Sequence, residues 1–181
     1  MPRIHILGAS GSGTTTLGGA VAAALGVPHR DSDAFFWRPT DPPFRSPRPP
    51  AERLALLLAA LPLPGGWVLS GSAIGWAKPL EPLYDLIVYL RLDPTLRMER
   101  LRRRERARYG GRVETGGDMA ESSAAFLRWA AAYDTAGPEQ RSRAAHERWL
   151  ASQSAPVLRL DSAAPVPQLA AAVLSAVRPA A

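Results

Sequence analysis

Short apolar runs alternate along the chain with segments whose apolar residues recur at helical spacing. Five runs are typical of buried strands, at residues 4–7, 27–33, 67–72, 86–92 and 157–160. Helical patterns begin after residue 13 and then occupy residues 51–61, 94–109, 118–134, 138–152 and 166–177. Strands that alternate with helices are typical of a parallel sheet covered by helices on both faces. The pattern therefore predicts an α/β fold.

Proline and glycine residues mark several boundaries of these elements. Asp93-Pro94 is an N-cap followed by a first-turn proline, which predicts the start of an arginine-rich helix. Residues 39–50 contain six prolines and predict a stiff, extended loop. Gly110-Gly111 and Gly116-Gly117 bracket a short segment that we expect to be a hinged flap.

A glycine-rich segment separates the first strand pattern from the first helical pattern. It matches the phosphate-binding loop G-x-x-x-x-G-K-[ST] except at Thr14, where lysine is expected. Its glycines let backbone N–H groups form a concave anion site, and the positive end of the next helix faces that site. We therefore predict that nucleotide phosphates bind here and that Thr15 ligates Mg²⁺; a plain glycine/serine turn is the alternative. The predicted cofactor-binding residues are Gly8, Ala9, Ser10, Gly11, Ser12, Gly13, Thr14, Thr15 and Thr16.

Two aspartates stand near the end of the second strand pattern, in Asp31-Ser32-Asp33. Ligands bind at the carboxyl ends of parallel strands, and side chains two residues apart in a strand share a face. Beside Mg²⁺ and ATP, one carboxylate would order the waters of the metal and the other would take a proton from a substrate hydroxyl. A solvated turn held by aspartate hydrogen bonds is the alternative.

The positive charge of the chain is carried almost wholly by arginine. The formal net charge is +6, and Lys78 is the only lysine. Four arginines are spaced by three or four residues, so they share one face of the predicted helix, and that face is suited to phosphate. Solvated surface side chains and a nucleic-acid contact are the alternatives. The four residues are Arg97, Arg100, Arg104 and Arg108.

The remaining composition narrows the class of protein. The 181 residues include no cysteine, which excludes disulfides and thiolate chemistry. No charged-then-apolar leader and no apolar stretch of membrane-spanning length is present, so we expect a cytoplasmic protein without a membrane partner. The aromatic run Phe35-Phe36-Trp37 either stacks on a base or packs in the core. We interpret the three histidines as structural.

These motifs resemble the P-loop small-molecule kinases of the adenylate-kinase and shikimate-kinase-like group, which includes bacterial adenylate-kinase-related, topology-modulation-type proteins. The resemblance rests on residues 8–16, on Asp31-Ser32-Asp33 and on the strand and arginine-rich helix at 84–112. It implies a five-stranded parallel sheet of the nucleoside-monophosphate-kinase type with a small helical lid. It also implies a single domain over residues 1–181, with an acceptor-side loop at about 34–61 and a lid at about 105–120.

The resemblance further implies roles for individual residues, with ATP and Mg²⁺ as cofactors. Asp31 would lie near the metal together with Thr15, and Asp33 would meet the acceptor hydroxyl. Arg100 and Arg104 match the paired lid-helix arginines that contact the transferring phosphates. The predicted catalytic residues are Asp33, Arg100, Arg104, Arg108 and Arg112, the last two if the flap closes over the nucleotide.

Two residues depart from the pattern of the family and leave the activity open. Thr14 removes the lysine that bridges the β- and γ-phosphates, and Ser70 stands where adenylate kinases carry an acid. We therefore expect an ATP-dependent phosphotransferase that acts on a small-molecule phosphate acceptor, with two alternatives. One is a nucleotide-binding module with little turnover, and the other is an ATPase associated with nucleic acid. The identity of the acceptor and the oligomeric state are not readable from the sequence.

Overall fold

The computed structural model describes residues 1–177, which form two compact units. The first, which we call the sheet unit, contains Met1–Gly8, Gly13–Leu90 and the chain from Gln153 onward. The second, which we call the helical unit, contains Ala9–Ser12 and Arg91–Ser152. The predicted acceptor-side loop at 34–61 belongs to the sheet unit, and the predicted lid at 105–120 belongs to the helical unit.

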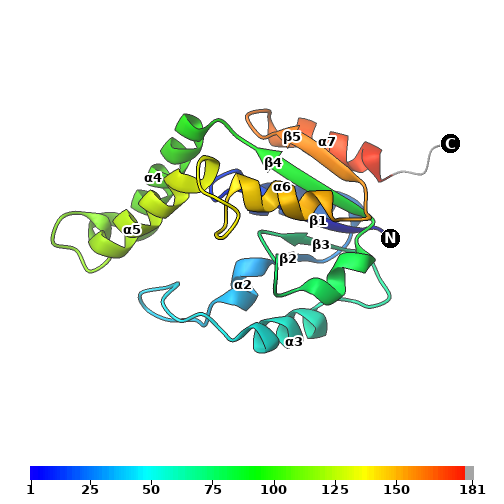
Figure 1. Cartoon of the computed structure of the whole chain (residues 1–181), viewed down its shortest axis with the longest axis horizontal. Coiled ribbons are helices and arrows are strands. Elements are labelled where there is room, and N and C mark those ends of the chain that lie inside the picture. Colours follow the sequence, from blue (N-terminus) through cyan, green and yellow to red (C-terminus); the bar gives the residue numbers. More distant parts are fainter. Residues whose placement is uncertain (178–181) are drawn as a thin grey trace. The chain divides into compact units, whose positions relative to one another are not determined.

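A five-stranded parallel sheet forms the centre of the sheet unit (Figure 1). Its strand order is β2-β3-β1-β4-β5. Ile4 of β1 lies between Val68 of β3 and Leu86 of β4 in the register of the sheet. This arrangement confirms the predicted α/β fold. The strands are β1 (Arg3–Gly8), β2 (His29–Asp31), β3 (Trp67–Ser70), β4 (Leu86–Arg91) and β5 (Val157–Asp161).

Helices pack on the sheet through alternate strand residues. Ile4 and Ile6 of β1 point to the same side and contact a cluster from α1 and α7 that includes Val21 and Val173. The intervening residues of β1, β3 and β4 are buried as well, as is usual for a parallel sheet with both faces covered. The helices of this unit are α1 (Thr14–Leu25), α2 (Ser32–Phe36), α3 (Pro50–Ala60), the 3₁₀ helix η1 (Lys78–Leu83) and α7 (Val166–Ala176).

The second strand is shorter than the sequence predicts, and this corrects the picture of the acidic pair. β2 ends at Asp31, although the pattern predicts a strand over residues 27–33. The Asp31 carboxylate accepts a hydrogen bond from the Asp33 backbone N–H and so caps α2 at its N-terminus. Asp33 therefore lies in the first turn of a helix, and the prediction that both aspartates share a strand face is wrong.

The helical unit is built around α4 (Pro94–Tyr109) and α5 (Ala120–Ala131). As predicted, Asp93 caps α4, accepting hydrogen bonds from two backbone N–H groups of its first turn. Met98, Leu101 and Ala130 form the apolar core between these helices. The predicted helix at 118–134 is α5 followed by the 3₁₀ turn of η3. The predicted helix at 138–152 starts later, because Ser142 caps a helix that begins only at Arg143. The other helices are η2 (Gly110–Val113), η3 (Ala132–Asp134) and α6 (Arg143–Ala151).

None of the helices in residues 1–177 has the length and apolar character needed to span a bilayer.

Candidate functional site

The predicted phosphate-binding loop has the backbone conformation that an anion site requires. β1 ends at Gly8 and α1 begins at Thr14, so the order is strand, glycine-rich turn and helix. Gly11 and Gly13 have φ of 86° and 89°, in the left-handed region that favours glycine. No side chain caps the N-terminus of α1, so the N–H groups of its first turn remain available to a ligand.

The two left-handed glycines of the loop have opposite surroundings. A Cβ atom on Gly11 would lie 2.8 Å from Leu101 Cγ and 3.1 Å from the carbonyl oxygen of Arg97. A Cβ atom on Gly13 would have nothing within 4 Å among the described residues. Gly11 therefore packs against α4 within the helical unit, whereas Gly13 faces open space.

The loop also contains a buried polar atom without a partner. Ser12 is 1% exposed, and its Oγ makes no hydrogen bond to any described residue. A buried hydroxyl left unpaired costs about 1–3 kcal/mol. This orphaned hydroxyl fits a loop that binds a group rich in hydrogen-bond acceptors, as phosphate is.

The carboxyl ends of three neighbouring strands bring the predicted metal ligands together. Ser70 of β3 pairs with Ile6 of β1 on one side and with Asp31 of β2 on the other. Thr15 Oγ1 donates a 2.6 Å hydrogen bond to Asp31 Oδ2, and the Asp33 N–H donates to Asp31 Oδ1. Hydroxyl and carboxylate oxygens are the ligands that Mg²⁺ prefers. Residues 1–177 contain no cluster of three or more histidine or acidic side chains that could hold a metal by themselves.

Two histidines form hydrogen bonds at the same edge of the sheet, with partners that the sequence does not reveal. His29 Nε2 lies 2.9 Å from Ser70 Oγ, and burial lowers the pKa of His29. His5 Nε2–H donates a 2.9 Å hydrogen bond to the carbonyl oxygen of Gly71, since a carbonyl oxygen only accepts. The spacing of His29 two residues before Asp31 is the only signal that could have suggested it. Both histidines are structural in the sense that the sequence predicts.

Of the four arginines that their spacing predicts on one phosphate-facing side of α4, Arg97 is engaged in a structural contact. Arg97 is 1% exposed, and its guanidinium donates to the carbonyl oxygen of Ala130 and to Asp134. Arg104 and Arg108 are exposed, whereas Arg100 is half-buried. The prediction fails at Arg97 because α5 and η3 cover this side of α4, which spacing along one helix cannot reveal.

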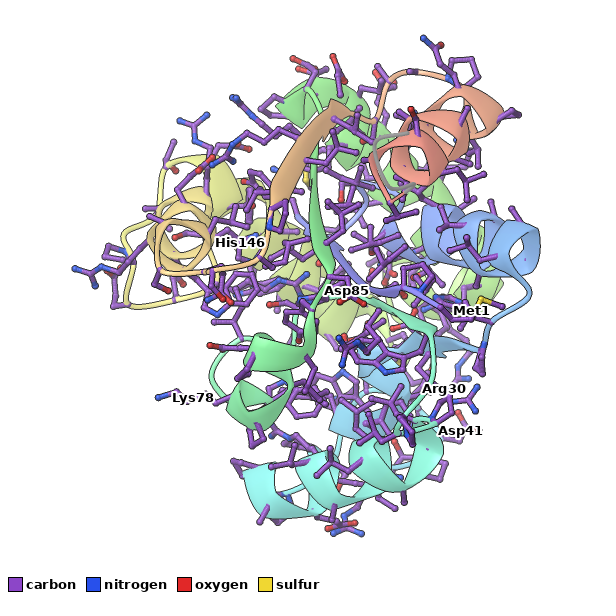
Figure 2. The ribbon with its side chains drawn as sticks, turned by 90° about the vertical axis from the view of Figure 1, so that its right-hand side faces the viewer. Met1, Arg30, Asp41, Lys78, Asp85 and His146 are labelled. Atoms are coloured by element: carbon purple, nitrogen blue, oxygen red, sulfur yellow. The ribbon has the colours of Figure 1, made fainter. Side chains whose placement is uncertain are left out.

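Arg112 and two other basic residues lie in distinct surroundings. Arg112 of η2 forms a two-pronged ion pair with Asp118, at 2.9 and 2.7 Å. Lys78 begins η1, is exposed and extends away from the ribbon (Figure 2). The guanidinium of Arg53 stacks 3.6 Å above the ring of Phe36, so this aromatic residue is half-buried against α3.

Two solved structures with the same fold are kinases. The chain matches a gluconokinase from Sinorhizobium meliloti 1021 with a TM-score of 0.53, at 19% identity, over 96% of this chain and 90% of that chain. It matches the shikimate kinase of Bacteroides thetaiotaomicron with a TM-score of 0.56, at 16% identity, over 97% of this chain and 98% of that chain. The fold is therefore that of the P-loop small-molecule kinases.

A closer relative defines the family. The chain is 44% identical over 159 residues to "Uncharacterized protein YqaC" of Bacillus subtilis (strain 168), and the match covers 88% of each protein. The chain belongs to the family of that protein. No protein-family model matches the sequence.

Proposed function

We propose that the protein is an ATP-dependent phosphotransferase that acts on a small molecule. One observation carries the proposal: the loop of residues 8–16 presents backbone N–H groups and the open face of Gly13 at the N-terminus of α1. The Thr15–Asp31 hydrogen bond supplies oxygen ligands directly after that loop. An anion site followed by hard oxygen ligands suits Mg²⁺ and a nucleoside triphosphate.

The proposed roles follow from the chemistry of each group. Residues 8–16 bind the phosphates, while Thr15 and Asp31 hold Mg²⁺, which would neutralise phosphate charge when bound. We assign the acceptor role to Asp33 rather than to Asp31, because both carboxylate oxygens of Asp31 accept hydrogen bonds, one from Thr15 and one from the α2 backbone. We propose that the exposed Asp33 carboxylate takes the proton of the acceptor hydroxyl.

Thr14 favours a second candidate, a nucleotide-binding module with little turnover. The lysine usual at this position meets the charge of the β- and γ-phosphates, and threonine carries none. Turnover therefore requires other cations, and we propose Arg100, Arg104, Arg108 and Arg112 for that role.

Calorimetric titration of the protein with ATP and Mg²⁺ tests the common element of both candidates. We expect the parent to bind and Gly13→Val to bind at least about tenfold more weakly, because its side chain would occupy the space that phosphate needs. Gly26→Val is the matched control, since Gly26 has φ of 65°, ends the same helix and also faces open space. Absence of binding by the parent, or equal binding by the two variants, would overturn the proposal.

A further inference from the structure

The tip of the phosphate-binding loop packs against α4. Ala9–Ser12 belong to the same compact unit as α4 and α5. Gly11 approaches α4 so closely that a Cβ atom there would lie 2.8 Å from Leu101 Cγ and 3.1 Å from the Arg97 carbonyl oxygen. The position of this turn of α4 therefore sets the position of the loop tip.

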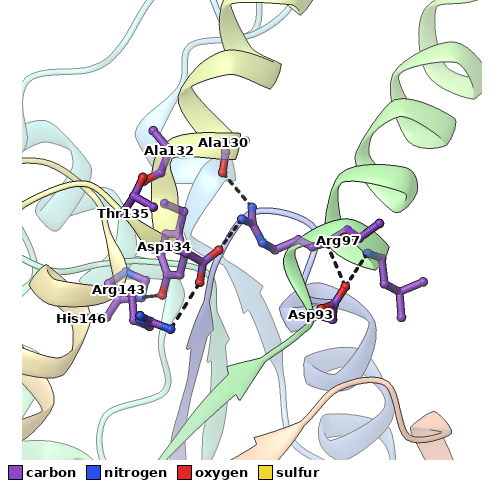
Figure 3. A network of polar contacts seen from close by, with 11 residues as sticks. Asp93, Arg97, Ala130, Ala132, Asp134, Thr135, Arg143 and His146 are labelled. Carbon is purple, nitrogen blue, oxygen red and sulfur yellow. Dashed lines mark hydrogen bonds and ion pairs between the residues drawn. The ribbon is translucent and has the colours of Figure 1, made fainter.

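An ion pair joins α4 to the end of α5 and to η3. The side chain of Arg97 leaves the first turns of α4 and reaches the end of α5, as Figure 3 shows. Its Nη1 donates to the Ala130 carbonyl oxygen and its Nη2 to Asp134 Oδ2, both at 2.8 Å. The side chain is 1% exposed and lies 5.3 Å from the centre of the Tyr133 ring. The outer oxygen of Asp134 lies 3.9 Å from Arg143, so the network ends at the surface.

Such a network is costly to break from one side. A buried guanidinium requires its carboxylate, and removal of one partner leaves an uncompensated charge in the interior. The apolar core around Met98 and Leu101 supplies contact area but no direction, whereas two hydrogen bonds in a planar fork define both distance and angle.

We infer that Arg97 and Asp134 are positioning residues, which hold the loop tip at residues 9–12 in its phosphate-binding conformation through the backbone of α4. Neither side chain touches the nucleotide. The inference rests on the proposed function for its effect on affinity, but its effect on the loop itself is independent of any ligand.

The first measurement is hydrogen exchange of the backbone amides in residues 9–12 without nucleotide. We expect Asp134→Asn to speed this exchange by about tenfold or more, because the asparagine keeps the volume and an acceptor but loses the charge that Arg97 requires. Asp134→Glu, which restores the carboxylate, should recover part of the protection. Arg143→Gln removes only the distant outer partner and serves as the control, with exchange close to that of the parent.

The second measurement is the affinity for ATP with Mg²⁺. We expect Asp134→Asn to raise Kd by about tenfold, since a displaced loop tip would align its backbone N–H groups less well with the phosphates. Arg97→Lys should act in the same direction, and Arg103→Lys, an exposed arginine of the same helix, should not.

The outcomes separate this inference from the proposed function. The positioning role is overturned if exchange at residues 9–12 in Asp134→Asn equals that of the parent when the two proteins are compared at equal global stability. A change in melting temperature alone does not support it. Faster exchange in Asp134→Asn, together with a parent protein that binds no ATP, would retain the positioning role and reject the proposed function.

Discussion

At the scale of single residues, the two aspartates after β2 have different duties. Asp31 accepts hydrogen bonds on both carboxylate oxygens, one from the Thr15 hydroxyl and one from the α2 backbone. Asp33, two residues later, projects from the first turn of α2 and is exposed. A carboxylate that organises local structure suits a metal-side role, and an exposed one suits contact with the acceptor.

Replacement of Asp33 by asparagine should therefore affect transfer more than nucleotide binding. We expect Asp33→Asn to lower kcat by about 10²-fold or more, the range for loss of a general base, with the Kd for ATP nearly unchanged. ADP release in the presence of an acceptor that the parent phosphorylates measures kcat, and calorimetric titration with ATP measures Kd. Asp85→Asn at the amino edge of the sheet, where Asp85 pairs with Arg3, is the control and should keep kcat. Equal turnover in Asp33→Asn and the parent would assign the pair to a solvated turn.

At the scale of elements, His5 links β1 to the turn that follows β3. Its ring is fully buried, lies 4.9 Å from the Tyr84 ring and donates to the Gly71 carbonyl oxygen. Burial lowers the pKa of His5 from 6.5 to about 4, so the ring is neutral in the folded protein at neutral pH. In the unfolded chain the same ring takes up a proton near its ordinary pKa.

This difference predicts a loss of stability in acid. Below pH 6.5 His5 binds a proton in the unfolded state, whereas in the folded state it stays neutral until about pH 4. The free energy of unfolding therefore falls as the pH decreases across this window. The contribution of His5 amounts to as much as about 3 kcal/mol, at about 1.4 kcal/mol per pKa unit. We expect His5→Gln, which keeps a donor to Gly71, to show a shallower decline in urea unfolding between pH 7 and pH 4. Parallel curves for the two proteins would contradict this assignment.

Local sequence signals predict most helices and strands. The predicted boundary is wrong where a side-chain hydrogen bond ends the element. The strand, glycine turn and helix of the phosphate loop follow from glycine placement and apolar periodicity, and the structure confirms them. The Asp93 cap of α4 is equally local. The end of β2 cannot be predicted in this way. The Asp31 carboxylate accepts a hydrogen bond from the Asp33 backbone N–H, and α2 therefore begins inside a segment whose pattern predicts a continuous strand.

At the scale of the whole molecule, the residues proposed for phosphate chemistry come from both compact units. Thr14 belongs to the sheet unit, whereas Arg100, Arg104, Arg108 and Arg112 belong to the helical unit. Thr14 and the arginines proposed to replace the missing lysine are therefore far apart in the sequence and belong to different units. A double-mutant cycle that measures turnover can test whether they act together.

A double-mutant cycle between Thr14 and Arg104 tests this connection. We expect Arg104→Ala to lower turnover about tenfold or more, because charge on the transferring phosphoryl group loses a cation. Thr14→Lys in that background should restore part of the loss. Arg103→Ala, which removes a neighbouring exposed arginine of α4, is the matched control. If Arg104→Ala is neutral and Thr14→Lys creates activity that the parent lacks, the natural protein is a nucleotide-binding module.

The sequence by itself determined the fold class, the phosphate loop and the identity of its anomaly at Thr14, because these depend on residues that are neighbours in the chain. Glycine placement, cap residues and apolar periodicity act over a few residues, so the elements that they specify can be predicted without the tertiary structure. The environment of the arginines was decided only by the tertiary structure. Arg97 shares its spacing with Arg100 and Arg104, yet α5 and η3 bury it beside Asp134, since a helix face acquires its function from whatever packs against it.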